Sequence, residues 1–161
     1  MITGKEKFIQ LILHPVKFRL FLFAKLPSAF FSGLRVQAFD SSKAVVTVPY
    51  KWFSKNPFKS TYFACLAMAA ELSTGLLAMM NTYQVDPSIS MLVTGLEAKY
   101  FKKATGKTSF LCEEGDSFHR TVLEAISSGE GRVLTAKSVG RNEAGEIVAE
   151  FLITWSFKVK K

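Results

Sequence analysis

The sequence predicts an α+β fold in which one curved antiparallel sheet wraps around a single long central helix. Residues 56–82 are apolar almost throughout and rich in strong helix formers, which indicates a buried helix about 30 Å long. Residues 147–159 carry apolar side chains at every second position, as in a strand with one face toward a core. That face must be buried on another element, and the central helix is the only expected one of sufficient length.

The first 31 residues predict two amphipathic helical pieces, at roughly 5–13 and 15–31, with Pro15 opening the second. Charged residues, His14 and Pro15 interrupt the apolar runs, so we expect neither a membrane span nor a secretory signal here. Two roles remain open for this segment. A basic amphipathic helix can lie on anionic lipid, or it can pack over an open end of the core.

A β-hairpin is predicted at 33–50, with its turn at 40–43. The loop that follows leads into the central helix. Asn56 followed by Pro57 predicts the N-cap and first turn of this helix, and Ser60 is a second candidate for the cap.

The remaining chain is rich in predicted strands, which we expect to form an antiparallel meander. They lie at 88–103, 107–113, 132–141 and 147–159. The first strand shifts its apolar phase at Thr94-Gly95, as a glycine β-bulge would cause. A short helix at 117–128, capped by Asp116 or Ser117, is expected between the second strand and the third.

The central helix carries two stripes of residues at helical spacing. One is an ordinary apolar face formed by Cys65, Met68, Leu72, Leu76 and Met79. The other is made of small residues around one acid, namely Ala64, Ala67, Glu71, Gly75 and Ala78. Small residues let another backbone approach closely, and Glu71 is the only charge between Lys59 and Asp86. We expect this carboxylate either to have a partner or to have its pKa raised by desolvation.

Composition limits the possible functions. The 161 residues are 48% hydrophobic, which fits one domain with a real core and excludes a disordered chain. The net charge of +8 favours anionic partners. No aromatic and basic strand pattern indicates RNA binding, so no nucleic-acid partner is expected, and no cluster of ligands indicates a metal. Cys65 and Cys112 are expected to be reduced packing residues of a cytoplasmic protein.

A short motif spans the loop before the central helix and the helix itself. It consists of Asn56, Ser60-Thr61, Tyr62-Phe63-Ala64, Ala70-Glu71 and Gly75. This motif resembles the hotdog-fold thioesterase superfamily, and within it a single-domain branch near the phenylacetyl-CoA thioesterase type. The resemblance implies one hotdog domain at 1–161, with a helical extension at 1–32 and the hotdog core at 33–161. The relatives usually have glycine in the turn before the helix, where this chain has Lys59-Ser60-Thr61.

By this resemblance the chain hydrolyses an acyl-CoA or acyl-carrier-protein thioester as a homodimer or a dimer of dimers. The amides near Ser60, Thr61 and Tyr62 at the helix N-terminus would polarise the thioester carbonyl. Glu71 lies about three turns farther along, too far to serve the same helix end. Since hotdog dimers build each site from two chains, Glu71 would act in the other subunit's site, activating water or attacking as a nucleophile. Asn56 would orient the water or the carbonyl.

Four lysines flank the turn at 104–106 and would meet the phosphates of CoA, namely Lys99, Lys102, Lys103 and Lys107. CoA is part of the substrate in this interpretation, and no cofactor or metal is expected.

Structural alternatives stay open for each of these residues. Glu71 could be a buried carboxylate that caps backbone N–H groups or pairs with a lysine. Asn56 could be a plain N-cap. The four lysines could simply be solvated residues at the end of a hairpin. The rival function is a non-catalytic hotdog module that binds acyl chains, or an anionic membrane surface through residues 1–31.

Overall fold

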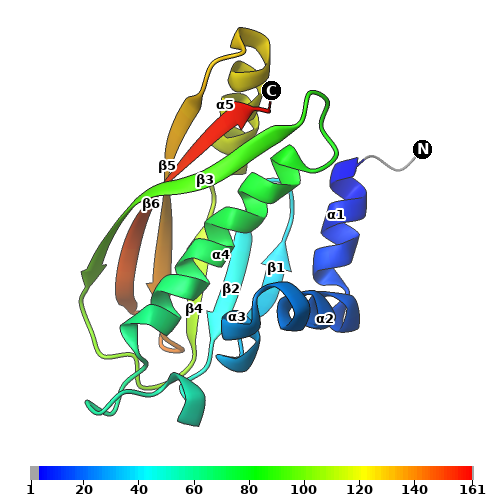
Figure 1. The fold of residues 1–161 in the computed structure, drawn as a ribbon. Helices are drawn as coiled ribbons and strands as arrows, with labels where there is room; N and C mark the ends of the chain where they lie inside the picture. Colours follow the sequence, from blue (N-terminus) through cyan, green and yellow to red (C-terminus); the bar gives the residue numbers. More distant parts are fainter. Residues whose placement is uncertain (1–3, 161) are drawn as a thin grey trace.

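Six strands form one curved antiparallel sheet in the computed structural model, which describes residues 4–160 (Figure 1). The strands are β1 (Arg35–Phe39), β2 (Ala44–Val48), β3 (Ile89–Tyr100), β4 (Thr108–Cys112), β5 (Arg132–Arg141) and β6 (Ile147–Val159). Their order across the sheet is β1-β2-β4-β5-β6-β3. The expected meander is therefore wrong in one respect, because β3 crosses to the far edge and pairs with β6 instead of β4.

The helices lie on the concave side of the sheet and at its ends. They are α1 (Gly4–Leu13), α2 (Pro15–Lys25), α3 (Pro27–Phe31), α4 (Phe63–Thr82) and α5 (Gly115–Ser128), with a 3-10 turn, η1, at Trp52–Ser54. Helix α4 crosses the inside of the sheet, as Figure 1 shows, with α1 to α3 on the β1 side of it. Helix α5 packs on β5 and β6 as well as on α4. The predicted α+β arrangement of a sheet around one helix is confirmed.

The side of α4 that faces the sheet is fully buried. Leu66, Ala69 and Leu77 lie there, and Ser73 donates to or accepts from Ser138 of β5 at 2.8 Å between the two hydroxyl oxygens. By length and composition α4 could cross a membrane, but 67% of its most apolar window is buried inside the fold. Its apolar character is therefore used in the core.

The predicted N-terminal caps of two helices are wrong. Helix α4 begins at Phe63 with Tyr62 as an N-cap that makes no side-chain hydrogen bond, so neither Asn56 nor Ser60 caps it. Helix α5 begins at Gly115 after Glu114, which also makes no capping bond through its side chain. In α4 the cause is local, because the polar side chains before the helix are used within the loop itself.

The second N-terminal helix is shorter than predicted. It ends at Lys25, and Pro27 opens the separate helix α3. Proline has no N–H to continue the helix and keeps the preceding residue, Leu26, out of the helical region, which explains the break. The two helices are held together by Arg19, whose guanidinium lies 4.0 Å from the centre of the Phe30 ring.

The remaining elements follow the prediction closely. Asp40 closes the β1–β2 turn by accepting from the amides of Ser42 and Lys43 at 2.8 and 3.0 Å. The register of β3 against β6 shifts between Val93 and Gly95, which confirms the bulge. Strands β5 and β6 have the expected boundaries.

Candidate functional site

A pocket of about 540 Å³ lies where the loop before α4 meets the segment that follows β3. Its lining residues are Asn56, Pro57, Phe58, Ser60, Thr61, Tyr62, Phe63, Leu66, Tyr100, Phe101, Lys102, Lys103 and Ala104. The N-terminal end of α4 opens into this pocket, which we call the helix-tip pocket. It brings together Asn56, the segment 60–62 and two of the four predicted lysines.

Asn56 organises the loop before α4. Its side-chain oxygen accepts from the amides of Phe58 and Ser60 at 2.9 and 3.2 Å and from the Ser60 hydroxyl at 3.2 Å. Its side-chain nitrogen donates to the Thr61 carbonyl at 3.4 Å. The polar atoms of Asn56 are thus used to shape the turn, which makes it a positioning residue for the helix tip.

The three amides expected to bind a carbonyl oxygen already donate within the chain. Ser60 N–H donates to Asn56 as described, Thr61 N–H to the Ala104 carbonyl at 2.7 Å, and Tyr62 N–H to the Ser54 carbonyl at 2.7 Å. These bonds hold the loop against its neighbours and fix the direction in which α4 begins.

The free donors of the helix tip are the next two amides. The first N–H groups of an α-helix have no partner inside the helix. The N–H groups of Phe63 and Ala64 have no acceptor in residues 4–160, whereas Cys65 N–H donates to the Tyr62 carbonyl at 2.9 Å. Two adjacent donors at the positive end of a 20-residue helix suit an oxygen that gains negative charge. The sequence did not reveal them, because they depend on where the helix starts.

Lys59 keeps the shape that glycine would give this turn. Its φ of 58° lies in the left-handed region, which side chains other than glycine rarely adopt. The relatives implied by the sequence resemblance usually have glycine in this turn. Lys59 therefore adopts a backbone conformation that favours glycine, at the cost of local strain.

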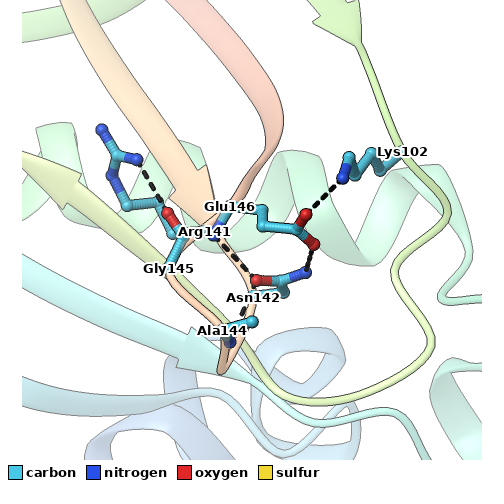
Figure 2. Close-up of polar contacts among 6 residues, drawn as sticks. All are labelled: Lys102, Arg141, Asn142, Ala144, Gly145 and Glu146. Atoms are coloured by element: carbon cyan, nitrogen blue, oxygen red, sulfur yellow. Dashed lines mark hydrogen bonds and ion pairs between the residues drawn. The ribbon is translucent and has the colours of Figure 1, made fainter.

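Lys102 and Lys103 stand at the rim of the helix-tip pocket. Figure 2 shows Lys102 paired with Glu146, whose other carboxylate oxygen accepts from Asn142 at 2.9 Å. The ion pair with Lys102 and the bond from Asn142 lower the pKa of Glu146. Lys103 donates to the Phe58 carbonyl at 3.4 Å.

The other two predicted phosphate ligands lie outside the residues that line this pocket. Lys107 is 3.9 Å from Glu143, and Lys99 is exposed on β3 opposite Glu150 of β6. Only Lys102 and Lys103 are thus placed beside the helix tip.

Glu71 lies in the middle of α4, beside the junction of α2 and α3. It lines a second pocket, of about 160 Å³, together with the α2–α3 junction (25–29), Met68 and Leu72. Its carboxylate makes no hydrogen bond or ion pair with any residue that the structure describes, although Lys25 lines the same pocket. Burial raises the pKa of Glu71. Of the two outcomes expected for this acid, the structure shows the desolvated one.

Gly75 and Trp155 explain how the Glu71 side chain fits. A Cβ atom on Gly75 would lie 3.2 Å from a carboxylate oxygen of Glu71 and 3.4 Å from the Trp155 ring. The indole N–H of Trp155 donates to the Thr74 hydroxyl at 2.9 Å, which fixes the ring. The absence of a side chain at position 75 thus leaves room for both the acid and the indole.

One chain cannot supply both halves of a reaction centre. From Phe63 to Glu71 the helix rises about 12 Å, which exceeds the reach of a carboxylate toward a group held at the helix tip. A site that uses both therefore needs a second copy of the chain.

Other chemistry is not indicated. Residues 4–160 contain no group of three His, Cys, Asp or Glu side chains that could hold a metal ion. His14 caps α2 by accepting from the Lys17 amide, and His119 lies 3.0 Å from the Lys5 ammonium, so neither lines the helix-tip pocket.

Comparison with known proteins gives a domain family and a fold. The profile of a family described as Domain of unknown function (DUF4442) matches residues 17–157. No curated protein matches the sequence at a significant level. The solved structure of PA5026 from Pseudomonas aeruginosa, described as a protein of unknown function and probable thioesterase, is similar with a TM-score of 0.76 at 18% identity, over 93% of this chain and 99% of that one.

Two further structures agree in fold. A protein of unknown function from Chlorobaculum tepidum has a TM-score of 0.78 at 16% identity, over 99% of this chain and 98% of that one. The thioesterase HI1161 of Haemophilus influenzae has a TM-score of 0.62 at 14% identity, over 86% of this chain and 87% of that one. At these identities the likeness shows the fold alone.

Proposed function

The chain belongs to the DUF4442 family and has the hotdog fold, and from this premise we propose that it hydrolyses an acyl-CoA or acyl-carrier-protein thioester as a dimer. The observation that carries the proposal is that α4 provides two chemically complementary groups. Two free amides at the helix tip suit an oxyanion, and a desolvated carboxylate suits a base. The description of HI1161 as a thioesterase, and of PA5026 as a probable one, adds support.

In the proposed mechanism, the thioester carbonyl oxygen accepts from the Phe63 and Ala64 amides. Glu71 of the partner subunit removes a proton from water, and the resulting hydroxide attacks the carbonyl carbon. The negative charge that develops on the oxygen is stabilised by the two N–H groups and the helix dipole. The tetrahedral intermediate then collapses, the carbon–sulfur bond breaks, and the Glu71 carboxylic acid returns the proton to the leaving thiolate.

The raised pKa of Glu71 favours its role as a base over that of a nucleophile. A carboxylate of ordinary pKa is a weak base, and desolvation makes it stronger. Asn56 acts on this reaction through the loop, because its hydrogen bonds set the position of the helix tip.

The CoA part of the substrate is assigned to the rim of the helix-tip pocket. Lys102 and Lys103 provide positive charge there for phosphate groups. Lys102 would exchange its pairing with Glu146 for a phosphate, so we expect it to contribute less than Lys103. Lys99 and Lys107 are assigned no direct contact.

The proposal is tested by hydrolysis of a panel of acyl-CoAs. Glu71→Gln should lower kcat by at least about a hundredfold, because the base is lost. Phe63→Pro removes one free amide at the first helical position, where proline is tolerated, and should lower kcat by about 10²- to 10³-fold.

Two controls separate these effects from damage to the fold. Phe63→Ala removes the same side chain but keeps the amide, so it should retain most of the activity. Glu97→Gln removes an exposed carboxylate on β3 and should have no effect. If the wild type hydrolyses none of the thioesters, or if Glu71→Gln hydrolyses them at the wild-type rate, the chain is a non-catalytic hotdog module or uses a different base.

A further inference from the structure

The outward side of α2 is apolar although nothing in residues 4–160 covers it. Val16, Leu20 and Phe23 follow one another at helical spacing and are exposed, while Phe18 and Leu22 on the opposite side are buried in the core. Leu20 is 62% exposed and Phe23 is 55% exposed. A surface helix normally carries polar residues on this side, so an apolar outward side needs a separate explanation.

The same surface continues onto α3 and η1 through a line of aromatic rings. The ring centres of Phe23 and Phe31 lie 6.3 Å apart, those of Phe31 and Phe53 5.9 Å, and those of Trp52 and Phe53 6.3 Å. Phe23, Phe31 and Phe53 are each about half exposed, and Trp52 is 78% exposed. We call the exposed set Val16, Leu20, Phe23, Phe31, Trp52 and Phe53 the aromatic face.

The positive charge of the protein is concentrated in the part of the chain that carries this face. Residues 1–70 contain ten of the 21 basic residues but only two of the 13 acidic ones, whereas residues 71–161 contain eleven of each. The whole net charge of +8 therefore comes from residues 1–70. Three exposed lysines lie close to this face in the chain: Lys17 follows Val16, Lys25 ends α2 two residues after Phe23, and Lys51 precedes Trp52.

We propose that the aromatic face docks on an anionic bilayer surface. Aromatic and aliphatic side chains enter the boundary between headgroups and acyl chains, and lysines around them bind anionic headgroups. Nucleic acid shares the charge preference, but Val16 and Leu20 offer nothing to bases or phosphates. A second copy bound symmetrically through the aromatic face itself is disfavoured, because such a contact would bring the same lysines together.

The face is held in a fixed shape, which lowers the entropic cost of docking. Arg19 stacks on Phe30 and donates to the Leu34 carbonyl at 3.3 Å, so α2 is tied to α3 and to the start of β1. Phe23 and Phe30 also contact each other, with ring centres 5.2 Å apart. The surface thus exists before it meets a membrane.

Vesicle flotation tests the proposal directly. The wild-type chain should float with phosphatidylserine-containing vesicles but not with pure phosphatidylcholine vesicles, and raising the salt from about 0.1 M to about 1 M should weaken the binding. Leu20→Asp/Phe23→Asp should weaken it by at least about tenfold. Leu123→Asp/Val133→Asp, which adds the same two negative charges at exposed apolar residues of α5 and β5, is the matched control and should float like the wild type.

Tryptophan fluorescence gives a readout that needs no substitution in the face. Of the two tryptophans, Trp52 is exposed and Trp155 is only 4% exposed, so a blue shift on adding anionic vesicles would report Trp52 entering the bilayer. We expect this shift with anionic vesicles and none with neutral ones.

Several results would overturn the membrane proposal. They are equal binding to both vesicle types, binding to neither, and unchanged flotation of Leu20→Asp/Phe23→Asp. Retention on RNA but not on vesicles would identify nucleic acid as the partner. Conversion of a dimer to monomers by the double substitution, without vesicle binding by the wild type, would identify a second copy. None of these measurements uses a thioester, so they stand apart from the proposed hydrolysis.

Discussion

Glu71 is an acid that the fold shields from water and that makes no ion pair within residues 4–160. Its position in the helix was evident from the sequence, because no other charge lies between Lys59 and Asp86. The free amides of Phe63 and Ala64 were not evident. Which N–H groups lack a partner depends on the residue at which the helix begins, and the sequence predicted a start several residues too early. At this scale, the chemistry of side chains was easier to predict than that of the backbone.

Because burial raises the pKa of Glu71, its ionisation should be visible in stability. The folded state favours the protonated form of Glu71. The stability that this form contributes is complete below the pKa that Glu71 has in the unfolded chain, and it is lost as the pH rises through the higher pKa that Glu71 has in the folded chain. Glu71→Gln removes this loss. We therefore expect the free energy of unfolding of Glu71→Gln to exceed that of the wild type at neutral pH, and the difference to shrink as the pH falls toward about 4.

Urea unfolding of both proteins at several pH values between about 4 and about 8 measures this difference. Glu97→Gln, an exposed carboxylate removed from β3, provides the matched comparison. A difference between Glu71→Gln and wild type that stays constant with pH would mean that Glu71 is not shielded from water, and the basis for its role as a base would be lost.

At the scale of elements, the loop before α4 led to the right fold family but to a wrong prediction of where the helix begins. Asn56-Pro57 matches a helix start, but the structure uses Asn56 to close the preceding turn and begins the helix at Phe63. Strand alternation gave β5 and β6 correctly, because it depends only on local spacing. The crossing of β3 to the far edge depends on pairing between distant segments, which no local pattern contains.

Lys59 offers a test of the loop as an element. Its left-handed backbone is strained, so Lys59→Gly should raise the free energy of unfolding by about 1 kcal/mol and leave thioester hydrolysis intact. Lys55 is exposed, with an extended backbone before the same loop, so Lys55→Gly should lower stability slightly instead. Chemical denaturation measures both. A loss of stability in Lys59→Gly comparable to that in Lys55→Gly would show that the turn does not adopt this shape in solution.

At the scale of the whole molecule, the proposed reaction belongs to a pair of chains. Glu71 and the helix tip of one chain lie about 12 Å apart along α4, so in the proposed reaction each centre would combine the tip of one chain with Glu71 of the partner subunit. The fold class and most element boundaries could be predicted from patterns within the 161 residues, whereas the dimer was expected only from the family resemblance, because contacts between chains leave no distinct local pattern.

Mixing two inactive variants tests this shared site. In a mixed dimer of Glu71→Gln with Phe63→Pro, one centre contains both substitutions and the other contains neither. Since random exchange makes about half of the dimers mixed, roughly a quarter of the wild-type activity should return. Either variant alone provides the baseline. No recovery, after subunit exchange has been verified by mass, would place the reaction within a single chain and contradict the assignment.

The depth at which α4 is buried has a consequence for synthesis of the chain. This helix leaves the ribosome before β3, β4, β5 and β6, four of the five strands that later pack against it. Until those strands arrive, the most apolar stretch of the nascent polypeptide has only β1, β2 and the N-terminal helices beside it. Chaperones that bind exposed apolar segments should therefore bind this chain most strongly at this stage of translation, before the sheet has formed around α4.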